Sequence, residues 1–196
     1  MSSLPSQLQH VAALIPAGAT VLDVGCADGL LLRHLRDTKG VDGRGLEIDP
    51  RLVSEAVSHG LSVVQGDADS DLADFPSDSV DYAVLSGTLQ ATRAPARVLS
   101  ELLRIGQRAI IAFPNFGHWR VRLDLLLSGR MPATASLPDS WFETANIHLC
   151  TVNDFRALAS SLGYRIDRVI HLSGDRPVTR HPNLLADYAI FLLGKG

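Results

Sequence analysis

The stretch VLDVGCADG at residues 21–29 decides the fold. Its apolar start, together with Thr20, is typical of a short buried strand, and its glycines indicate a turn. Leu31, Leu32 and Leu35 then follow at helical spacing. A strand that runs into a glycine-rich turn and then a helix is where open α/β sheets bind nucleotides. The stretch therefore predicts an α/β fold with a nucleotide-type site at this turn.

Strands and helices alternate along the rest of the chain. Further strands are expected at residues 43–48, 61–65, 80–85, 108–113, 165–172 and 186–193. Helices are expected from Pro5, from Asp49 and Pro50, from Pro95, and after a capping box formed by Thr151 and Asp154. This alternation predicts a mostly parallel, seven-stranded, Rossmann-like sheet with helices on both faces. Because no helix separates the last two strands, we expect the last strand to be antiparallel.

The length of 196 residues predicts one domain over residues 1–196, since domains average roughly 150 residues. The stretch at about 114–150, between the fifth strand and the following helix, is longer than ordinary connections in α/β domains. Its length indicates a functional insertion.

Composition limits the classes of partner. Hydrophobic residues make up 46% of the chain, which is ordinary for a globular protein, and 18 basic against 21 acidic residues disfavour a nucleic-acid partner. No apolar run approaches the roughly 20 residues that span a bilayer, and residues 1–9 lack the basic start of a secretory signal. Cys26 and Cys150 are too few for a disulfide framework or a four-cysteine zinc site. We expect a cytoplasmic protein with no metal and no membrane association.

Three kinds of glycine-rich turn are candidates for residues 21–29. A phosphate loop ends in Gly-Lys-Ser/Thr, and this turn contains no basic residue, so that interpretation fails. A dinucleotide fingerprint needs three glycines, where this chain has Gly25, Ala27 and Leu30. The third pattern, an acid followed by alternating small residues, fits Asp23, Gly25, Ala27 and Gly29.

That third pattern resembles the turn of the class I S-adenosylmethionine (SAM)-dependent methyltransferases. SAM carries a sulfonium and an ammonium group but no phosphate, so its site can be acidic where a dinucleotide site cannot. The resemblance implies that Glu47 binds both ribose hydroxyls of SAM or S-adenosylhomocysteine. It also implies that Asp67 accepts a hydrogen bond from the adenine amino group, with Ala68 beside the ring. Ser86 and Gly87 would face the methionyl end.

Ala27 departs from the methyltransferase pattern, which usually has a second glycine there. Its methyl group is expected to narrow the approach to the ligand, so Ala27→Gly should tighten SAM binding or leave it unchanged. We expect the same substitution to lower stability by ~0.4–1 kcal/mol, because glycine raises the entropy of the unfolded chain.

Four further stretches are similar to the methionine-biosynthesis protein family called MetW. They are LSGTLQAT (85–92), FPNFGHWRVRLDLLLSGRMP (113–132), WFETANIHLCT (141–151) and NLLADYAIFLL (183–193). With the SAM motifs, the resemblance covers residues 20–193. It implies a methyltransferase-like fold and a supporting role for homoserine O-acyltransferase, an early enzyme of methionine synthesis, but it implies no methyl acceptor.

The sequence contains few signs of which molecule would accept a methyl group. The motifs of nucleic-acid methyltransferases are missing after the fourth strand, and no G-x-S-x-G elbow suggests acyl transfer. His118 and His148 are the candidate catalytic bases, with Trp119 and Trp141 as walls of an acceptor site. Either histidine could instead make structural hydrogen bonds, and either tryptophan could pack beneath the insertion.

The insertion also predicts a partner surface. It concentrates aromatic residues with arginines, the types enriched in interface hot spots. They are Phe113, Phe116, Trp119, Trp141 and Phe142, with Arg120, Arg122 and Arg130. Three functions stay open: an accessory partner of the acyltransferase, a small-molecule methyltransferase, and a SAM sensor.

Overall fold

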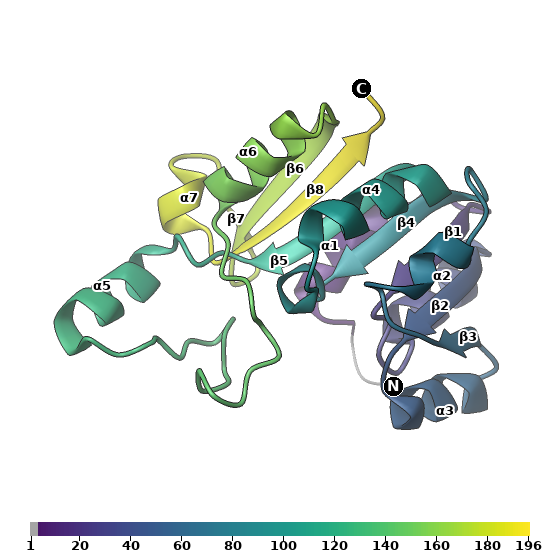
Figure 1. Ribbon diagram of the computed structural model, residues 1–196, viewed down its shortest axis with the longest axis horizontal. Helices are drawn as coiled ribbons and strands as arrows, with labels where there is room; N and C mark the ends of the chain where they lie inside the picture. The colour runs from purple at the N-terminus through teal and green to yellow at the C-terminus, as the bar shows by residue number, and fades with distance from the viewer. Residues whose placement is uncertain (1–3) are drawn as a thin grey trace.

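The computed structural model describes residues 4–196, so residues 1–3 of the expected domain lie outside the described part. An eight-stranded sheet with the order β3-β2-β1-β4-β5-β8-β6-β7 forms its centre (Figure 1). The strands are β1 (Thr20–Val24), β2 (Asp42–Glu47), β3 (Ser62–Gln65), β4 (Val80–Ser86), β5 (Gly106–Pro114), β6 (Arg165–Ser173), β7 (Arg176–Pro177) and β8 (Tyr188–Gly194). Strands β1 to β5 pair in parallel, and β8 lies antiparallel between β5 and β6. The mostly parallel α/β sheet with an antiparallel last strand is therefore confirmed. The expectation that no helix precedes the last strand is wrong, because the one-turn helix α7 (Pro182–Leu185) lies between β7 and β8.

The strand count was expected to be seven and is eight. The additional strand, β7, has two residues and folds back on the end of β6, where Ser173 pairs with Arg176. Gly174 makes this tight return possible at φ +56°. A two-residue strand is too short to leave a periodic pattern, which is why the sequence did not indicate it.

Helices cover both faces of the sheet, as expected. On one face lie α1 (Ser6–Leu14), α2 (Leu30–Lys39) and α3 (Pro50–Ser58), and on the other α4 (Pro95–Ile105) and α6 (Val152–Ser161). The strands alternate between two cores: Leu22 packs with α4 and α6, whereas Val21 packs with α1 and α2. Burial on both faces explains the apolar runs of the central strands β4, β5 and β8. None of the helices in residues 4–196 is long and apolar enough to cross a membrane.

Two helix starts follow the predicted capping chemistry. The Asp49 carboxylate accepts a hydrogen bond from the Arg51 backbone N–H at 2.8 Å at the start of α3. Thr151 and Asp154 form a reciprocal capping box at the start of α6. These caps fix where the chain enters each helix after the sheet.

Between β5 and α6 the insertion leaves the body of the domain. It contains α5 (Trp119–Ser128), which extends away from the sheet (Figure 1). Asn115 closes its base: the Asn115 side-chain oxygen accepts hydrogen bonds from the Gly117 and Val152 N–H groups, and its amide donates to Ala186 O at 2.7 Å. Asn115 is buried, so these bonds hold both ends of the insertion at the sheet.

Candidate functional site

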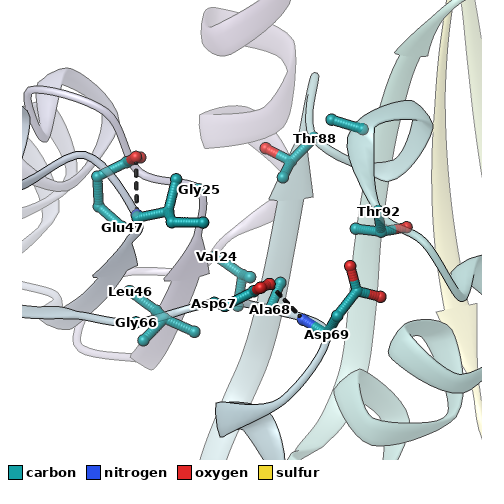
Figure 2. Close-up of a pocket in the computed structure, with 12 residues that line it drawn as sticks. Val24, Gly25, Leu46, Glu47, Gly66, Asp67, Ala68, Asp69, Thr88 and Thr92 are labelled. Atoms are coloured by element: carbon teal, nitrogen blue, oxygen red, sulfur yellow. Dashed lines mark hydrogen bonds between the residues drawn. The ribbon is translucent and has the colours of Figure 1, made fainter. Parts of the chain in front are cut away.

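A cavity of about 180 Å³ opens at the carboxyl ends of the first parallel strands (Figure 2). Its lining includes four of the predicted cofactor residues: Gly25, Glu47, Asp67 and Ala68. The remaining lining residues are Val24, Leu46, Ile48, Gly66, Asp69, Thr88, Ala91 and Thr92. Carboxyl ends of parallel strands are the usual ligand position in open α/β sheets. The other four predicted cofactor residues, Asp23, Ala27, Gly29 and Ser86, are not among the described lining residues.

The two glycines of the first turn have different tasks. Gly25 has φ +72°, and a Cβ atom there would lie 2.2 Å from the Thr88 Oγ1. Gly25 therefore lets the first turn approach the far wall of the cavity. Gly29 has φ +76° at the N-terminus of α2, where a Cβ atom would lie 2.3 Å from the Leu61 Cδ1. Gly29 thus serves helix packing, behind the cavity.

Ala27 has a left-handed backbone, with φ +49°. A residue with a Cβ atom is strained there by roughly 1–2 kcal/mol, which glycine avoids. Relief of this strain opposes the ~0.4–1 kcal/mol of unfolded-state entropy, so the backbone geometry leads us to expect that Ala27→Gly raises stability rather than lowers it, and this change stays a prediction. Alanine gives no sign of a positive φ in a sequence.

Glu47 is fixed at the end of β2 and is only 7% exposed. One carboxylate oxygen accepts from the Ala27 N–H at 2.8 Å, and the other accepts from the Ile48 and Asp49 N–H groups at 2.9 and 3.0 Å. Three backbone donors hold the Glu47 carboxylate in one position. Carboxylate oxygens have about four acceptor sites in total, so capacity for a further donor remains.

Asp67 follows β3 on the opposite side of the cavity. One of its oxygens accepts from the Asp69 N–H at 2.9 Å, as Figure 2 shows, and the other lies 3.1 Å from the Arg93 guanidinium. The Asp69 carboxylate in turn accepts from the backbone N–H groups of Arg93 and Ala94. The residues after β3 are thereby tied to the chain after β4.

Asp23 lies beneath the turn on β1 and is 3% exposed. Burial, and secondly the nearby charge of Glu47, raise the pKa of Asp23 to about 7. The two acids give this end of the sheet a negative character. Among the described residues that line the cavity there is no lysine or arginine.

This arrangement suits a cationic, hydroxyl-bearing nucleoside. The acids can accept from hydroxyl, amino and ammonium groups, and a glycine cradle at Gly25 allows close approach of the ligand. A diphosphate would instead meet carboxylates. The residues present therefore fit SAM or S-adenosylhomocysteine better than a dinucleotide.

The predicted catalytic histidines lie apart from this cavity. His118 precedes α5 and is buried, and burial lowers its pKa, so its ring is neutral at pH 7. His148 is exposed, with a ring nitrogen 3.4 Å from Arg93 O. Neither is among the described lining residues, and their catalytic role stays a prediction. In residues 4–196 no three His, Cys, Asp or Glu side chains are placed to hold a metal ion.

Ser86, predicted to face the methionyl end, lies at the end of β4. Burial raises the pKa of the Tyr188 hydroxyl at the start of β8. The two cysteines are thiols rather than thiolates, because burial raises the pKa of Cys26 to about 12 and also raises that of Cys150. Cys26 is buried and Cys150 is partly buried against the core, so both act as small packing residues.

Sequence reasoning missed the residues after β4. Thr88, Ala91 and Thr92 line the cavity, around the short 3-10 helix η2 (Leu89–Ala91). They form part of LSGTLQAT, a stretch that the sequence marked only as a point of family resemblance. None of these side chains is charged, so no chemical pattern singled them out.

The insertion exposes much of its apolar surface. Leu126 and Leu127 on α5 are 80% and 76% exposed, and Trp141 and Phe142 are 73% and 70% exposed. Phe113, which was predicted to belong to this surface, is fully buried on β5 and packs against Phe155 and Phe191. That assignment is wrong, because composition alone does not tell which face of a strand a side chain occupies.

A model of the family described as methionine biosynthesis protein MetW matches residues 6–193. The chain belongs to the MetW family. It is 33% identical over 195 residues to the bifunctional methionine biosynthesis protein MetXA/MetW of Rhodopirellula baltica. That match covers 93% of this chain and 31% of the relative, so the MetW-family chain spans about a third of the relative's length.

Solved structures show the same fold. A SAM-dependent methyltransferase from Archaeoglobus fulgidus matches with a TM-score of 0.72 at 14% identity, covering 97% of this chain and 92% of that chain. One from Thermotoga maritima matches with a TM-score of 0.72 at 16% identity, covering 97% and 88%. The chain therefore has the Rossmann-like class I methyltransferase fold.

Proposed function

We propose that this MetW-family protein binds SAM or S-adenosylhomocysteine and acts as an accessory partner of homoserine O-acyltransferase. The observation that carries the first half is the acidic cavity, with Glu47 and Asp67 on opposite sides and Gly25 against Thr88. Glu47 would bind the ribose hydroxyls and Asp67 the adenine amino group, with Ala68 beside the ring. Asp23 would support the turn from below. SAM would supply a sulfonium-bound methyl group.

The proposed partner is supported by the family and by the exposed apolar side chains of the insertion. The Rhodopirellula baltica relative joins MetXA and MetW in one protein, and the family resemblance implies homoserine O-acyltransferase as the partner. Leu126, Leu127, Trp141 and Phe142 are exposed on the insertion. Large exposed apolar groups on an otherwise ordinary surface mark interaction sites.

The accessory role is preferred to methyl transfer because neither histidine predicted as a catalytic base is among the described residues that line the cavity. His118 is buried at the base of the insertion, and His148 faces the solvent. In methyl transfer, a base is needed only where the acceptor must lose a proton. Release of S-adenosylhomocysteine from SAM in the presence of a metabolite would favour the methyltransferase alternative.

Calorimetric titration with S-adenosylhomocysteine tests the ligand. We expect Glu47→Ala to weaken binding by ~1.5–3 kcal/mol, because it removes a charged acceptor. Glu47→Gln keeps the length of the side chain and should bind with intermediate affinity. Glu55→Ala, an exposed glutamate on α3, is the matched control. No binding by the parent protein, or unchanged binding in Glu47→Ala, would contradict the assignment.

Co-purification with a homoserine O-acyltransferase tests the partner. The parent protein is expected to form a stable complex. Recovery of the separate proteins at every ratio would contradict the accessory role while leaving the ligand assignment in place.

A further inference from the structure

The chain after β4 contacts both the cavity and the insertion. We call residues 88–94 the connecting segment. Three of its residues line the cavity: Thr88, Ala91 and Thr92. Between them, the backbone carbonyl of Gln90 accepts hydrogen bonds from the Ile147 and His148 N–H groups at 2.8 and 2.9 Å. A single turn of helix, η2, therefore faces the ligand on one side and holds the end of the insertion on the other.

Those two hydrogen bonds are the main backbone link of the far part of the insertion, residues 130–149. Within the described part of the chain, they are the backbone–backbone hydrogen bonds that join residues 130–149 to the rest of the protein. The other such bonds of this stretch are internal, as between Thr134 and Leu137. Segments held by few hydrogen bonds open at low free energy. The order of residues 146–149 thus depends strongly on the position of Gln90, whereas the Cys150 carbonyl also accepts a hydrogen bond from the Phe116 N–H at 3.2 Å.

The side chain of Gln90 strengthens the same link. It is 1% exposed, and its amide N–H groups donate to Pro114 O at 3.1 Å and to Cys150 Sγ at 3.3 Å. Gln90 therefore ties η2 to the end of β5 and to the end of the insertion. Among the described residues its amide oxygen has no hydrogen-bond partner. Burying an oxygen without a hydrogen-bond partner costs free energy. The packing around Gln90 therefore offsets this cost and keeps the side chain in its position.

Arg93 makes a second contact between the two regions. Its guanidinium lies 3.1 Å from the Asp67 carboxylate on the cavity side, and its backbone oxygen lies 3.4 Å from the His148 ring. A ligand that donates to the Asp67 carboxylate therefore shares this acceptor with the Arg93 guanidinium. Ligand binding therefore alters the surroundings of the connecting segment both at Thr88 and at Arg93.

We propose that ligand occupancy of the cavity controls the order of residues 146–149 through the connecting segment, with Gln90 as the positioning residue. This inference rests on the proposed function, which supplies the ligand. A ligand against Thr88, Ala91 and Thr92 restricts η2, and the Ile147 and His148 N–H groups then separate less often from Gln90 O. By linkage, a partner that binds the ordered insertion tightens ligand binding by the same factor.

Hydrogen–deuterium exchange with and without saturating S-adenosylhomocysteine tests the coupling. In the parent protein, the ligand should slow exchange of the Ile147 and His148 amides by about tenfold, since exchange follows the free energy of local opening. Gln90→Leu should lose this slowing while it binds the ligand within about threefold of the parent, which calorimetry measures. Gln107→Leu, an exposed glutamine at the start of β5, is the matched control and should behave as the parent.

The outcomes separate the coupling from the proposed function. If the ligand binds and these two amides exchange at an unchanged rate, the coupling is wrong and the ligand assignment stands. If the parent protein binds no ligand, both are wrong. Full slowing in Gln90→Leu would overturn the role of Gln90. If Gln90→Leu does not fold, Arg93→Ala, at an exposed side chain, should reduce the slowing, and an undiminished effect would overturn the inference.

Discussion

The cavity and the insertion are opposite kinds of structure on one chain. Around the cavity, buried acids such as Glu47 accept several backbone N–H bonds, and glycines such as Gly25 allow atoms to approach closely. In the insertion, residues 130–149 have few bonds to the body, and Leu126 and Trp141 face the solvent. Rigid, well-satisfied geometry suits recognition of one small ligand. An exposed, loosely held apolar surface suits a partner that completes its packing.

This contrast predicts that substitutions in one region leave the function of the other in place, except along the connecting segment. The strongest test is Gly25→Ala, whose Cβ atom would lie 2.2 Å from Thr88 Oγ1 at a backbone φ of +72°. We expect calorimetry to detect no binding of S-adenosylhomocysteine. Gly163→Ala is the control, since it has φ +74° and no atom within 4 Å of its Cβ position. Equal loss of binding in both variants would indicate general unfolding rather than a blocked cavity.

Asp23 gives the cavity region a pH dependence. Its pKa is about 7 in the folded protein, above its value of 3.8 in a model compound. The folded state therefore binds the additional proton, and the stability from this group is lost as pH rises from about 4 to about 7. At 1.36 kcal/mol per pKa unit the change is about 2–4 kcal/mol.

Asp23→Asn removes that titration. Urea unfolding at pH 5 and pH 8 should show the variant gaining stability relative to the parent as pH rises. Asp42→Asn, an exposed aspartate on β2, is the control and should follow the parent. A constant difference between Asp23→Asn and the parent across this range would show that Asp23 is already ionised at low pH.

The insertion is tested at Leu126 and Leu127. Replacing both with serine should weaken the acyltransferase complex by about 2 kcal/mol, or 30-fold, if they are hot-spot residues. Binding of S-adenosylhomocysteine should be unchanged, because neither residue contacts the cavity. Val57→Ser on α3 is the control, since Val57 is likewise an exposed apolar residue but lies in the other region. Partner affinity equal to that of the parent would place the interface elsewhere.

The sequence predicted the sheet and the cavity better than the contacts of the insertion. The sheet and the caps at Asp49 and Thr151 were predictable, because periodicity and capping chemistry are local properties. The acids Glu47 and Asp67 were named through the methyltransferase resemblance, and both line the cavity. The bonds from Gln90 to residues 147 and 148 were not predictable, because they join segments far apart in the chain and involve backbone atoms that every residue has.

Other residues were missed for related reasons. Phe113 was assigned to the surface because it belongs to an aromatic-rich stretch, although β5 is buried on both faces. Arg93 was not considered, because its contact with Asp67 depends on how the chain returns after β4. Side-chain direction and long-range pairing arise only when the elements pack.

The smallest expected effect distinguishes backbone strain from ligand contact in the first turn. Ala27 is exposed with φ +49°, so Ala27→Gly removes a strain of roughly 1–2 kcal/mol and adds ~0.4–1 kcal/mol of unfolded-state entropy. We expect a net gain in stability of about 0.5 kcal/mol by urea unfolding. Affinity for S-adenosylhomocysteine should be equal or slightly higher, because the Ala27 N–H bond to Glu47 is kept. Strongly weakened binding would instead make the Ala27 methyl group a ligand contact, and the turn would then recognise the ligand through a side chain as well as through its backbone.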